Sequence, residues 1–340
     1  MFRIASMVAS WSILSFSLTL IDGVAKPDVN APGPVKPDRT WLWVDPTNRT
    51  DTYYGLGSKD RQPRGDEFTF VEEDTDGVNP KYVVTDADGV KWKLKIGLEA
   101  RPEVAASRLL WAAGYHTHED YFVPALHVLN LPEHLHRGKN LIGPGGTMRN
   151  ARMRRYRDHE KKVGWWNWTD CPFSGTREFN GLRTLMALIN NWDTKDVNTA
   201  IYDNWKATPE RPVRMYMVSD LGSSFGETSL SWNQEHIKGN LDFYSRSKFI
   251  TSTTPDRVSF SVPGNFRIDN GTVVQYLFRR PRQWITKDVP RADARWIGHV
   301  LARLTPAQIR DIFRAAGYSP EVGEGFARAL EARIAELCAI

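Results

Sequence analysis

The chain has 340 residues, of which 45 are basic and 40 are acidic, so its formal net charge is +5. This mild basicity comes without a long run of Lys and Arg, and nucleic-acid binding is therefore not expected. The two cysteines exclude a cysteine-cluster zinc site and a disulfide-dense scaffold, while a single Cys171–Cys338 bridge stays open.

Residues 1–25 predict a secretory signal peptide. Arg3 precedes a mostly apolar stretch over residues 4–21, and small residues at 23–25 provide a cleavage site. The apolar stretch is short and rich in serine for a membrane span, so an uncleaved anchor is the second interpretation. We expect an exported protein, periplasmic or extracellular, that contacts a membrane only if this segment is not cleaved.

Residues 26–66 predict an extended leader. The segment is rich in Pro, Gly, Asp and Arg and holds one aromatic patch at residues 41–44. We expect it to be exposed and held at that single point. The Gly55-Leu56-Gly57-Ser58 sequence is interpreted as a turn, because no strand clearly precedes it.

Residues 67–140 carry the pattern of a small β lobe. Strand patterns at 68–71, 81–85 and 90–96 are separated by Asp-Gly turns, which predicts an antiparallel meander. Lys91, Lys93 and Lys95 alternate with apolar residues in the third strand, so they share one face. A helical pattern then opens at Glu103 and ends at Gly114. The simplest interpretation is a set of solvated lysines and a glutamate that favours the helix dipole.

The next segment predicts further strands, at residues 121–129 and 151–156, the second of which is alternatively a basic surface. Five histidines gather nearby, but they lack the helical spacing of a metal site, so a metal centre is not expected there. We expect the tryptophans to pack in the core. The histidines are His116, His118, His127, His134 and His136, and the tryptophans are Trp165, Trp166 and Trp168.

Residues 179–226 hold the pattern richest in chemistry. Apolar residues recur every three or four positions over 179–189, which predicts a helix that ends at Asn190-Asn191. A charged loop, Asp193-Thr-Lys195-Asp196-Val-Asn198, follows. Strand patterns at 199–202 and 214–218 then predict a hairpin that ends in Asp220-Leu221-Gly222. Without further support this is an ordinary solvated helix, loop and hairpin.

The order of a strand lysine, a helix glutamate, Asp-x-Lys-x-x-Asn and Asp-x-Gly resembles the protein-kinase-like superfamily. The similarity is to its atypical branch, which includes HipA-like kinases, phosphatidylinositol kinases and secreted kinases. Residues 177–182 and 190–198 are also similar to segments of a group of exported bacterial proteins. The resemblance implies that Asp193 orients an acceptor hydroxyl, that Lys195 balances phosphoryl charge, and that Asn198 and Asp220 hold Mg²⁺ or Mn²⁺.

The resemblance further implies that Lys95, with Lys93 as second choice, contacts the phosphates of ATP and pairs with Glu103. Three departures accompany it. The turn between the first two strands is acidic and has Gly77 in place of a glycine-rich loop, Asn191-Trp192 replaces His-Arg, and no Ala-Pro-Glu segment follows. A pseudokinase, a ligand-binding or structural cell-envelope protein, and a nucleotidyl transferase therefore stay open.

Residues 141–340 complete the expected large lobe. Short strand patterns at 259–262 and 266–268 precede three helical patterns, at 291–304, 305–316 and 320–338. The predicted fold is α+β and two-lobed, kinase-like, with a small antiparallel β lobe with one helix and a larger, mainly helical lobe. The predicted function is Mg²⁺–ATP-dependent phosphotransfer to a protein or a small hydroxylated acceptor.

Overall fold

The computed structural model describes residues 38–77, 79–227, 238–261 and 280–340. The chain falls into two units, Met1–Lys36 and Pro37–Ile340, and only the second contains described residues. The predicted signal peptide and the strand pattern at 266–268 lie outside the described residues.

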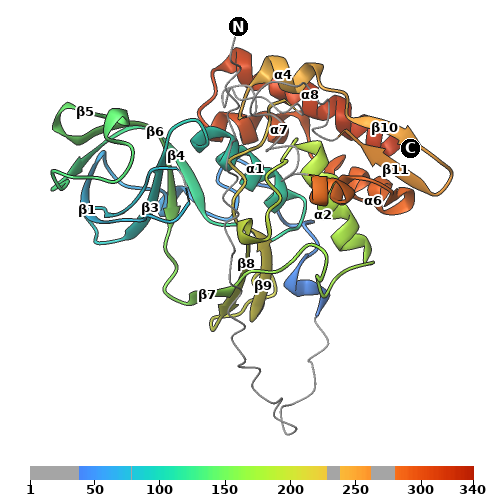
Figure 1. Cartoon of the computed structure of the whole chain (residues 1–340), viewed down its shortest axis with the longest axis horizontal. Helices are drawn as coiled ribbons and strands as arrows, with labels where there is room; N and C mark the ends of the chain where they lie inside the picture. The colour runs from blue at the N-terminus through green and yellow to red at the C-terminus, as the bar shows by residue number, and fades with distance from the viewer. Residues whose placement is uncertain (1–37, 78, 228–237, 262–279) are drawn as a thin grey trace, which may run out of the picture. The chain divides into compact units, whose positions relative to one another are not determined.

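The strands between residues 67 and 155 build a six-stranded sheet, and α1 lies beside it (Figure 1). Its strand order is β3-β2-β1-β4-β6-β5, and an additional β3–β6 pairing closes five of the strands into a ring. The strands are β1 (Glu67–Glu73), β2 (Lys81–Thr85), β3 (Lys91–Ile96), β4 (Asp120–Leu129), β5 (Ile142–Gly143) and β6 (Thr147–Arg155).

The predicted meander of β1, β2 and β3 is confirmed, because both pairings are antiparallel. The pairing of β1 with β4 is parallel, a contact that the sequence pattern did not indicate. Alternation along β3 places Trp92, Leu94 and Ile96 in a hydrophobic cluster inside the sheet. The sheet also continues through β6, past residue 140, where the sequence placed the boundary between the lobes.

Helix α1 (Ala100–Ala112) lies between the two lobes and packs against β4, β6 and α7. It begins before Glu103, which still falls in its first turn. Gly114 has a φ of 102° just past the helix and so ends it, as predicted. Val104, Leu109 and Leu110 join the hydrophobic core of the helical lobe rather than that of the sheet. The helix therefore contacts the sheet through β4 and β6 but contributes its apolar side chains to the core of the helical lobe.

The remainder forms the larger lobe, which combines helices with two three-stranded sheets, β7-β8-β9 and β10-β11-β12. Its strands are β7 (Glu160–Gly164), β8 (Thr199–Asn204), β9 (Arg214–Val218), β10 (Ile250–Thr253), β11 (Arg257–Phe260) and β12 (Val289–Pro290). Its helices are α2 (Arg177–Leu188), α4 (Leu241–Arg246), α6 (Arg291–Leu301), α7 (Pro306–Ala315) and α8 (Pro320–Ala339). The short 3₁₀ turns of the chain are η1 (Arg39–Trp41), η2 (Lys59–Arg61), η3 (Lys139–Leu141), η4 (Pro144–Gly146), η5 (Asp196–Asn198) and η6 (Arg280–Thr286).

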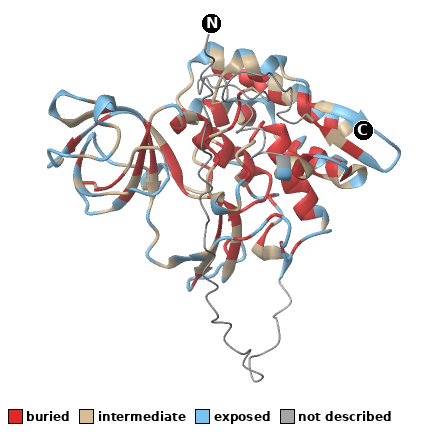
Figure 2. Cartoon of the chain, in the orientation of Figure 1, coloured by how far each residue is buried: buried red, intermediate tan, exposed pale blue. Residues whose placement is uncertain are grey.

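Separate hydrophobic clusters fill the sheet and the helical lobe, as the buried residues in Figure 2 show. The predicted α+β, two-lobed organisation is confirmed. The predicted helix α7 opens with a capping box, in which Thr305 and Gln308 bond each other's backbone N–H groups. Trp166 and Trp168 lie in the helical core, as expected, while Trp165 is half exposed.

The predicted aromatic anchor at residues 41–44 is confirmed, but the expectation that it is the single attachment of an exposed segment is wrong for residues 38–66. Leu42 and Trp43 are buried in the helical core. Farther along, the Thr52 hydroxyl donates to the carbonyl of Gln308 at 2.7 Å. Arg61 then makes two hydrogen bonds to the buried carboxylate of Glu119, just before β4. The Pro and Gly residues here form turns along the surface of the fold. Side-chain hydrogen bonds, rather than the backbone hydrogen bonds of a helix or sheet, hold this segment in place.

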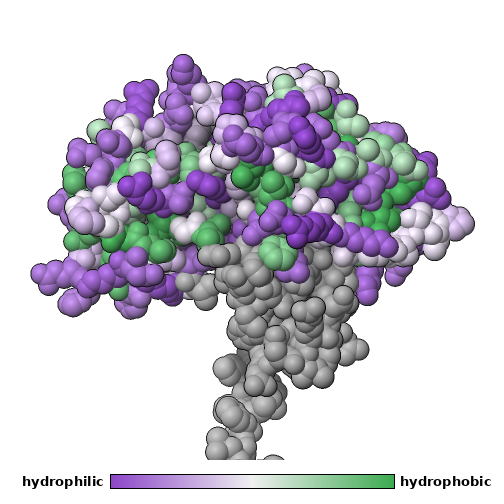
Figure 3. All heavy atoms as spheres, turned by 90° about the horizontal axis from the view of Figure 1, so that it is seen from above, coloured by the Kyte–Doolittle hydropathy of each residue, from purple (hydrophilic) through white to green (hydrophobic). Residues whose placement is uncertain are grey.

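The possible disulfide between Cys171 and Cys338 is absent, because both residues are free thiols. Burial raises the pKa of the Cys171 thiol to about 12, which keeps it protonated. Within the described ranges, no helix is long and apolar enough to cross a membrane. Figure 3 shows a face on which hydrophobic residues occur in several separate groups among hydrophilic ones.

Candidate functional site

Lys95 lies near the end of β3, and only 3% of its surface is exposed. Its ammonium donates to Glu99 Oε2 at 2.8 Å and to Glu103 Oε2 at 2.9 Å. It also lies 3.3 Å from Oδ1 of Asp220, which follows β9. The predicted contact between Lys95 and Glu103 is thus present, and one buried cation joins the sheet, α1 and the hairpin.

The second oxygen of Glu103 faces two arginines of β6. Oε1 accepts a hydrogen bond from Arg154 Nη2 at 2.8 Å and lies 3.4 Å from Arg152 Nη2. Burial alone would raise the pKa of Glu103, but Arg152, Lys95 and Arg154 outweigh it and lower that pKa to about 2. The alternative of a basic surface at residues 151–156 is therefore wrong for Arg152, which is buried against carboxylates.

Burial disfavours the charged form of Lys95, yet its carboxylate neighbours prevail. Glu103, Asp220 and Glu99 together raise the pKa of Lys95 above its ordinary value. The carboxylates therefore favour the protonated, positively charged form of Lys95.

Glu99 is a member of the site that the sequence analysis missed. It precedes α1, and its Oε1 pairs with Lys238 Nζ at 2.7 Å while its Oε2 binds Lys95. Its spacing of four residues from Lys95 was a signal, but nothing in the sequence pointed to Lys238. A Cβ at Gly222 would lie 2.7 Å from the Glu99 carboxylate. The glycine of Asp-x-Gly therefore lets the loop after β9 approach Glu99.

Lys93, the second choice for the site lysine, has another partner. Its Nζ lies 2.5 Å from Asp74 Oδ2, and Lys81 Nζ lies 3.6 Å from Asp74 Oδ1. Asp74 belongs to the acidic turn between β1 and β2, so two lysines offset part of the negative charge of that turn. The three lysines of this strand face thus differ in burial: Lys91 is exposed, Lys93 is half-buried, and Lys95 is buried and contacts Glu103.

The charged loop after α2 has its own internal bonds. Asp193 Oδ1 pairs with Lys195 Nζ at 2.7 Å, and both side chains remain partly exposed. The Asn198 amide donates to the backbone carbonyl of Asp193 at 2.7 Å. Asn191 supports the loop from the other end, because its Oδ1 accepts from the Asp193 N–H at 3.1 Å. The loop therefore presents Asp193, Lys195 and Asn198 together.

Asn198 and Asp220 are linked through the backbone. The carbonyl of Asn198 accepts from the N–H groups of Ser219 at 2.8 Å and Asp220 at 3.2 Å. Because the Asn198 Nδ2 is used within the loop, its amide oxygen is the atom left for a ligand. The Asp220 side chain is 40% exposed. Amide and carboxylate oxygens are ligands of the kind that Mg²⁺ or Mn²⁺ takes, so the donor types of Asn198 and Asp220 fit the predicted metal.

Glu99, Glu103 and Asp220 also approach one another, with one oxygen of each inside 4.8 Å. The Lys95 ammonium contacts all three, however, and so occupies the place that a cation would take. Among the described residues this is the sole cluster of metal-ligand type, so the histidines form no such group there. His116 instead donates from Nε2 to the carbonyl of Thr40 at 2.7 Å.

A cavity of about 360 Å³ lies beside this network, between β3, β6, the β6–β7 connection and β8. Arg154 links the cavity to the Lys95 network, because it lines the cavity and donates a hydrogen bond to Glu103. The two carboxylates in the wall, Glu119 and Glu160, are each bound by arginines. Tyr202 provides an aromatic surface, packed edge-on against His118. The basic residues of the wall are Lys93, Arg154, Arg155, Arg157, Lys161 and Lys162.

No protein-family model and no curated protein matches the sequence. Solved structures include similar chains. The proinflammatory kinase CtkA of Helicobacter pylori matches with 10% identity and a TM-score of 0.35, over 80% of this chain and 98% of that chain. The Golgi casein kinase matches with 9% identity and a TM-score of 0.39, over 82% of this chain and 71% of that chain. The structure of the Golgi casein kinase with Mn and ADP bound matches with 10% identity and a TM-score of 0.39, over 84% of this chain and 77% of that chain. At these TM-scores, nothing about the chemistry of this chain is inferred from the likeness.

Proposed function

We propose that this chain is a kinase-like phosphotransferase that uses ATP with Mg²⁺ or Mn²⁺ and acts on a protein or a small hydroxylated acceptor. The observation that carries the proposal is the buried Lys95 ammonium, held at once by Glu103 of α1 and Asp220 after β9. A structural ion pair would need one carboxylate. Two carboxylates at the start of α1 and a third after β9 fix the position of this cation, which is what phosphate binding requires.

The roles follow from the chain's own atoms. Lys95 faces phosphate oxygens, and Glu103 holds its ammonium in place before the nucleotide arrives. Asn198 and Asp220 would hold the metal, which neutralises phosphate charge when bound. Asp193 is partly exposed and accepts or orients the proton of the acceptor hydroxyl. Lys195, paired with it, balances charge on the transferred group.

The cavity beside Arg154 is the proposed nucleotide pocket. Arg155, Lys161 and Lys162 make no ion pair with a described residue and would complement a polyphosphate, while the two acids of the wall are already neutralised by arginines. Tyr202 offers a ring face on which a base can stack. The volume of about 360 Å³ lies within the range of small-molecule sites.

Thermal unfolding with ATP, in the presence and absence of Mg²⁺ or Mn²⁺, tests binding, and release of ADP tests transfer. Asp220→Asn should abolish the metal-dependent part of the stabilisation. Asp193→Ala should retain binding and lose turnover, because its partner is the acceptor. Asp170→Asn, at an exposed carboxylate outside the site, is the matched control and should change neither measurement.

Two results would contradict the proposal. Equal Mg²⁺–ATP binding by Asp220→Asn and the parent would place the metal elsewhere. No stabilisation by ATP with either metal would remove the phosphotransferase proposal and favour a structural or ligand-binding protein.

A further inference from the structure

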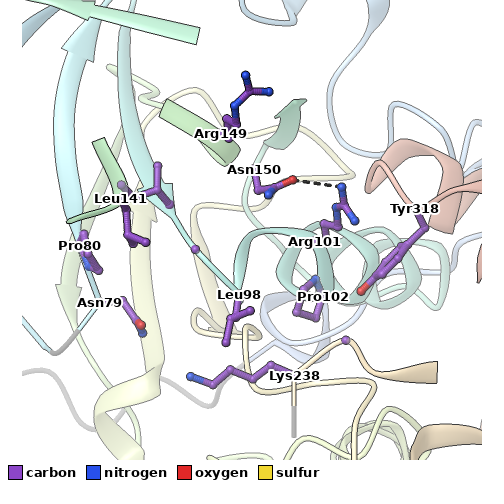
Figure 4. Close-up of a pocket in the computed structure, with 13 residues that line it drawn as sticks. Asn79, Pro80, Leu98, Arg101, Pro102, Leu141, Arg149, Asn150, Lys238 and Tyr318 are labelled. Carbon is purple, nitrogen blue, oxygen red and sulfur yellow. Dashed lines mark hydrogen bonds between the residues drawn. The ribbon is translucent and has the colours of Figure 1, made fainter. Parts of the chain in front are cut away.

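Lys238 lines a second, larger cavity of about 780 Å³ (Figure 4). Its ammonium binds Glu99, which in turn binds Lys95. Arg101, Pro102 and Tyr318 stand on one side of the cavity, opposite Pro80 and Leu141. Its other walls come from the end of β3, from β6 and from residues 238–239. It shares no lining residue with the proposed nucleotide pocket.

The charged side chains that line this cavity are all positive. Arg101, Arg149 and Lys238 line it, and none of its described lining residues is an acid. Lys238 is bound to Glu99 and Arg101 donates to Asn150 at 3.0 Å, whereas Arg149 has no hydrogen bond or ion pair to any described residue. Two more polar atoms in the wall, Arg101 Nε and Tyr318 Oη, are buried and lack a partner in the described parts of the chain. Such donors favour an anion.

The rest of the wall is apolar. Leu98 and Leu141 line this space and are 50% and 44% exposed, so both can contact a ligand there. Pro80, Ile96 and Pro102 extend the same surface. A hydrated ion alone would leave these side chains in contact with water. A ligand that carries both an anionic group and an apolar body would use both parts of the wall.

We propose that this cavity is a binding site for a small organic anion, with its carboxylate or phosphate group at Arg101, Lys238 and the Tyr318 hydroxyl, and its apolar body against Leu98 and Leu141. Arg149 lies at the rim and adds long-range attraction for the anion. The site stands on its own lining residues and does not depend on the proposed activity.

One consequence does rest on the proposed nucleotide site. An anion that binds Lys238 draws it away from Glu99, whose carboxylate then has Lys95 as its remaining ion-pair partner. The unbalanced negative charge next to Lys95 opposes the binding of phosphate. Ligand in the second cavity should therefore weaken ATP binding, and ATP should weaken ligand binding by the same factor.

Calorimetric titration of the full chain tests the site with phenyl phosphate, with inorganic phosphate as the probe that lacks an apolar body and phenol as the probe that lacks a charge. We expect saturable one-to-one binding of phenyl phosphate, clearly tighter than that of either partial probe. Leu98→Asp should lower its affinity at least roughly tenfold, about 1.4 kcal/mol. Leu98→Asn should lower it less, because it adds no charge. Leu129→Asp, at an equally exposed leucine of β4 outside the cavity, should have no effect.

Tyr318→Phe removes the unpartnered hydroxyl without changing shape and should also weaken phenyl phosphate. Loss of binding in Lys162→Gln, with Leu98→Asp unaffected, would place the probe in the other pocket and overturn the proposal. Absence of saturable binding would overturn it as well. If phenyl phosphate binds as expected and ATP does not bind at all, the second site stands while the proposed function fails. Unchanged ATP affinity at saturating phenyl phosphate would refute the coupling alone.

Discussion

Lys95 keeps its charge where almost no water reaches it, so its removal should have two separable effects. Lys95→Met leaves Glu99 and Glu103 with fewer cations, and the free energy of unfolding should fall by about 3–5 kcal/mol. The affinity for ATP with metal, measured by calorimetry on the folded fraction, should fall at least tenfold, about 1.4 kcal/mol. Glu103→Gln should reproduce part of this loss, and the double variant should be less than additive.

Neighbouring lysines on the same strand are the controls for Lys95. Lys91→Met should change neither the free energy of unfolding nor the affinity for ATP, because the Lys91 side chain is exposed. Lys93→Met should have an intermediate effect at most, through release of Asp74 in the β1–β2 turn. If ATP affinity depends on Lys93 and not on Lys95, the nucleotide contacts a different part of β3. If neither lysine matters, the kinase-like function is wrong.

At the residue scale, the sequence predicts contacts between residues that lie close together along the chain. The contact between Lys95 and Glu103 was predicted from their order and spacing and is confirmed, while the roles of Asp193, Lys195 and Asn198 stay predictions. Lys238 and Arg154 could not be found in this way, because they reach Glu99 and Glu103 from distant segments. A surface lysine and a buried one look alike in sequence, and only tertiary contacts distinguish them.

At the element scale, the loop after β9 and the start of α1 meet at Gly222 and Glu99. Gly222→Ala should push the Glu99 carboxylate away from Lys95, because the new Cβ would lie 2.7 Å from Oε2. Unfolding should become easier by about 1–3 kcal/mol, with a parallel loss of ATP affinity. Gly164→Ala is the control, since its Cβ would meet nothing within 4 Å. Equal stability of the two variants would show that the Glu99 side chain moves aside without cost.

The strands illustrate which contacts a sequence can predict. Alternation and Asp-Gly turns were enough for β1, β2 and β3, which pair with their chain neighbours. The parallel β1–β4 pairing and the closing β3–β6 pairing join segments separated by whole elements, and no local pattern encodes such registers. The anchored segment of residues 38–66 was missed for the same reason, because its partners lie far along the chain.

For the whole molecule, stability should fall as the solution becomes acidic. Burial and the nearby Arg211 lower the pKa of His116 from 6.5 to about 3. Below pH 6.5 the unfolded chain binds a proton that the folded chain does not, so the free energy of unfolding decreases by up to about 1.4 kcal/mol per pH unit. Burial lowers the pKa of His118 too, with the same sign. From pH 4.5 down to about 2, Glu103 adds to the loss.

Urea unfolding at a series of pH values measures this dependence. His116→Gln should reduce the slope between pH 6.5 and 3, while the exposed His134→Gln should leave it unchanged. A slope that is the same in the parent and in His116→Gln would mean that the buried ring takes up its proton without unfolding.

Export also concerns the molecule as a whole, and it stays a prediction. We expect cleavage after Ala25, because the apolar stretch ends in Gly23-Val24-Ala25. N-terminal sequencing of protein from a native-like host measures this, and the described residues would all remain in the mature chain. A protein recovered from the cytosol that begins at Met1 would contradict it.

The anchored segment of residues 38–66 is fastened to both lobes, through Trp43 in the helical core and through the Arg61–Glu119 pair at the start of β4. Any hinge rotation that separates the lobes has to stretch that pair or withdraw Trp43. Arg61 also neutralises Glu119, which lines the proposed nucleotide pocket, so its loss should alter the wall of that pocket as well as the link between the lobes. Shortening the residence time of a bound nucleotide should therefore be achievable at Arg61, far in sequence from every residue that recognises it.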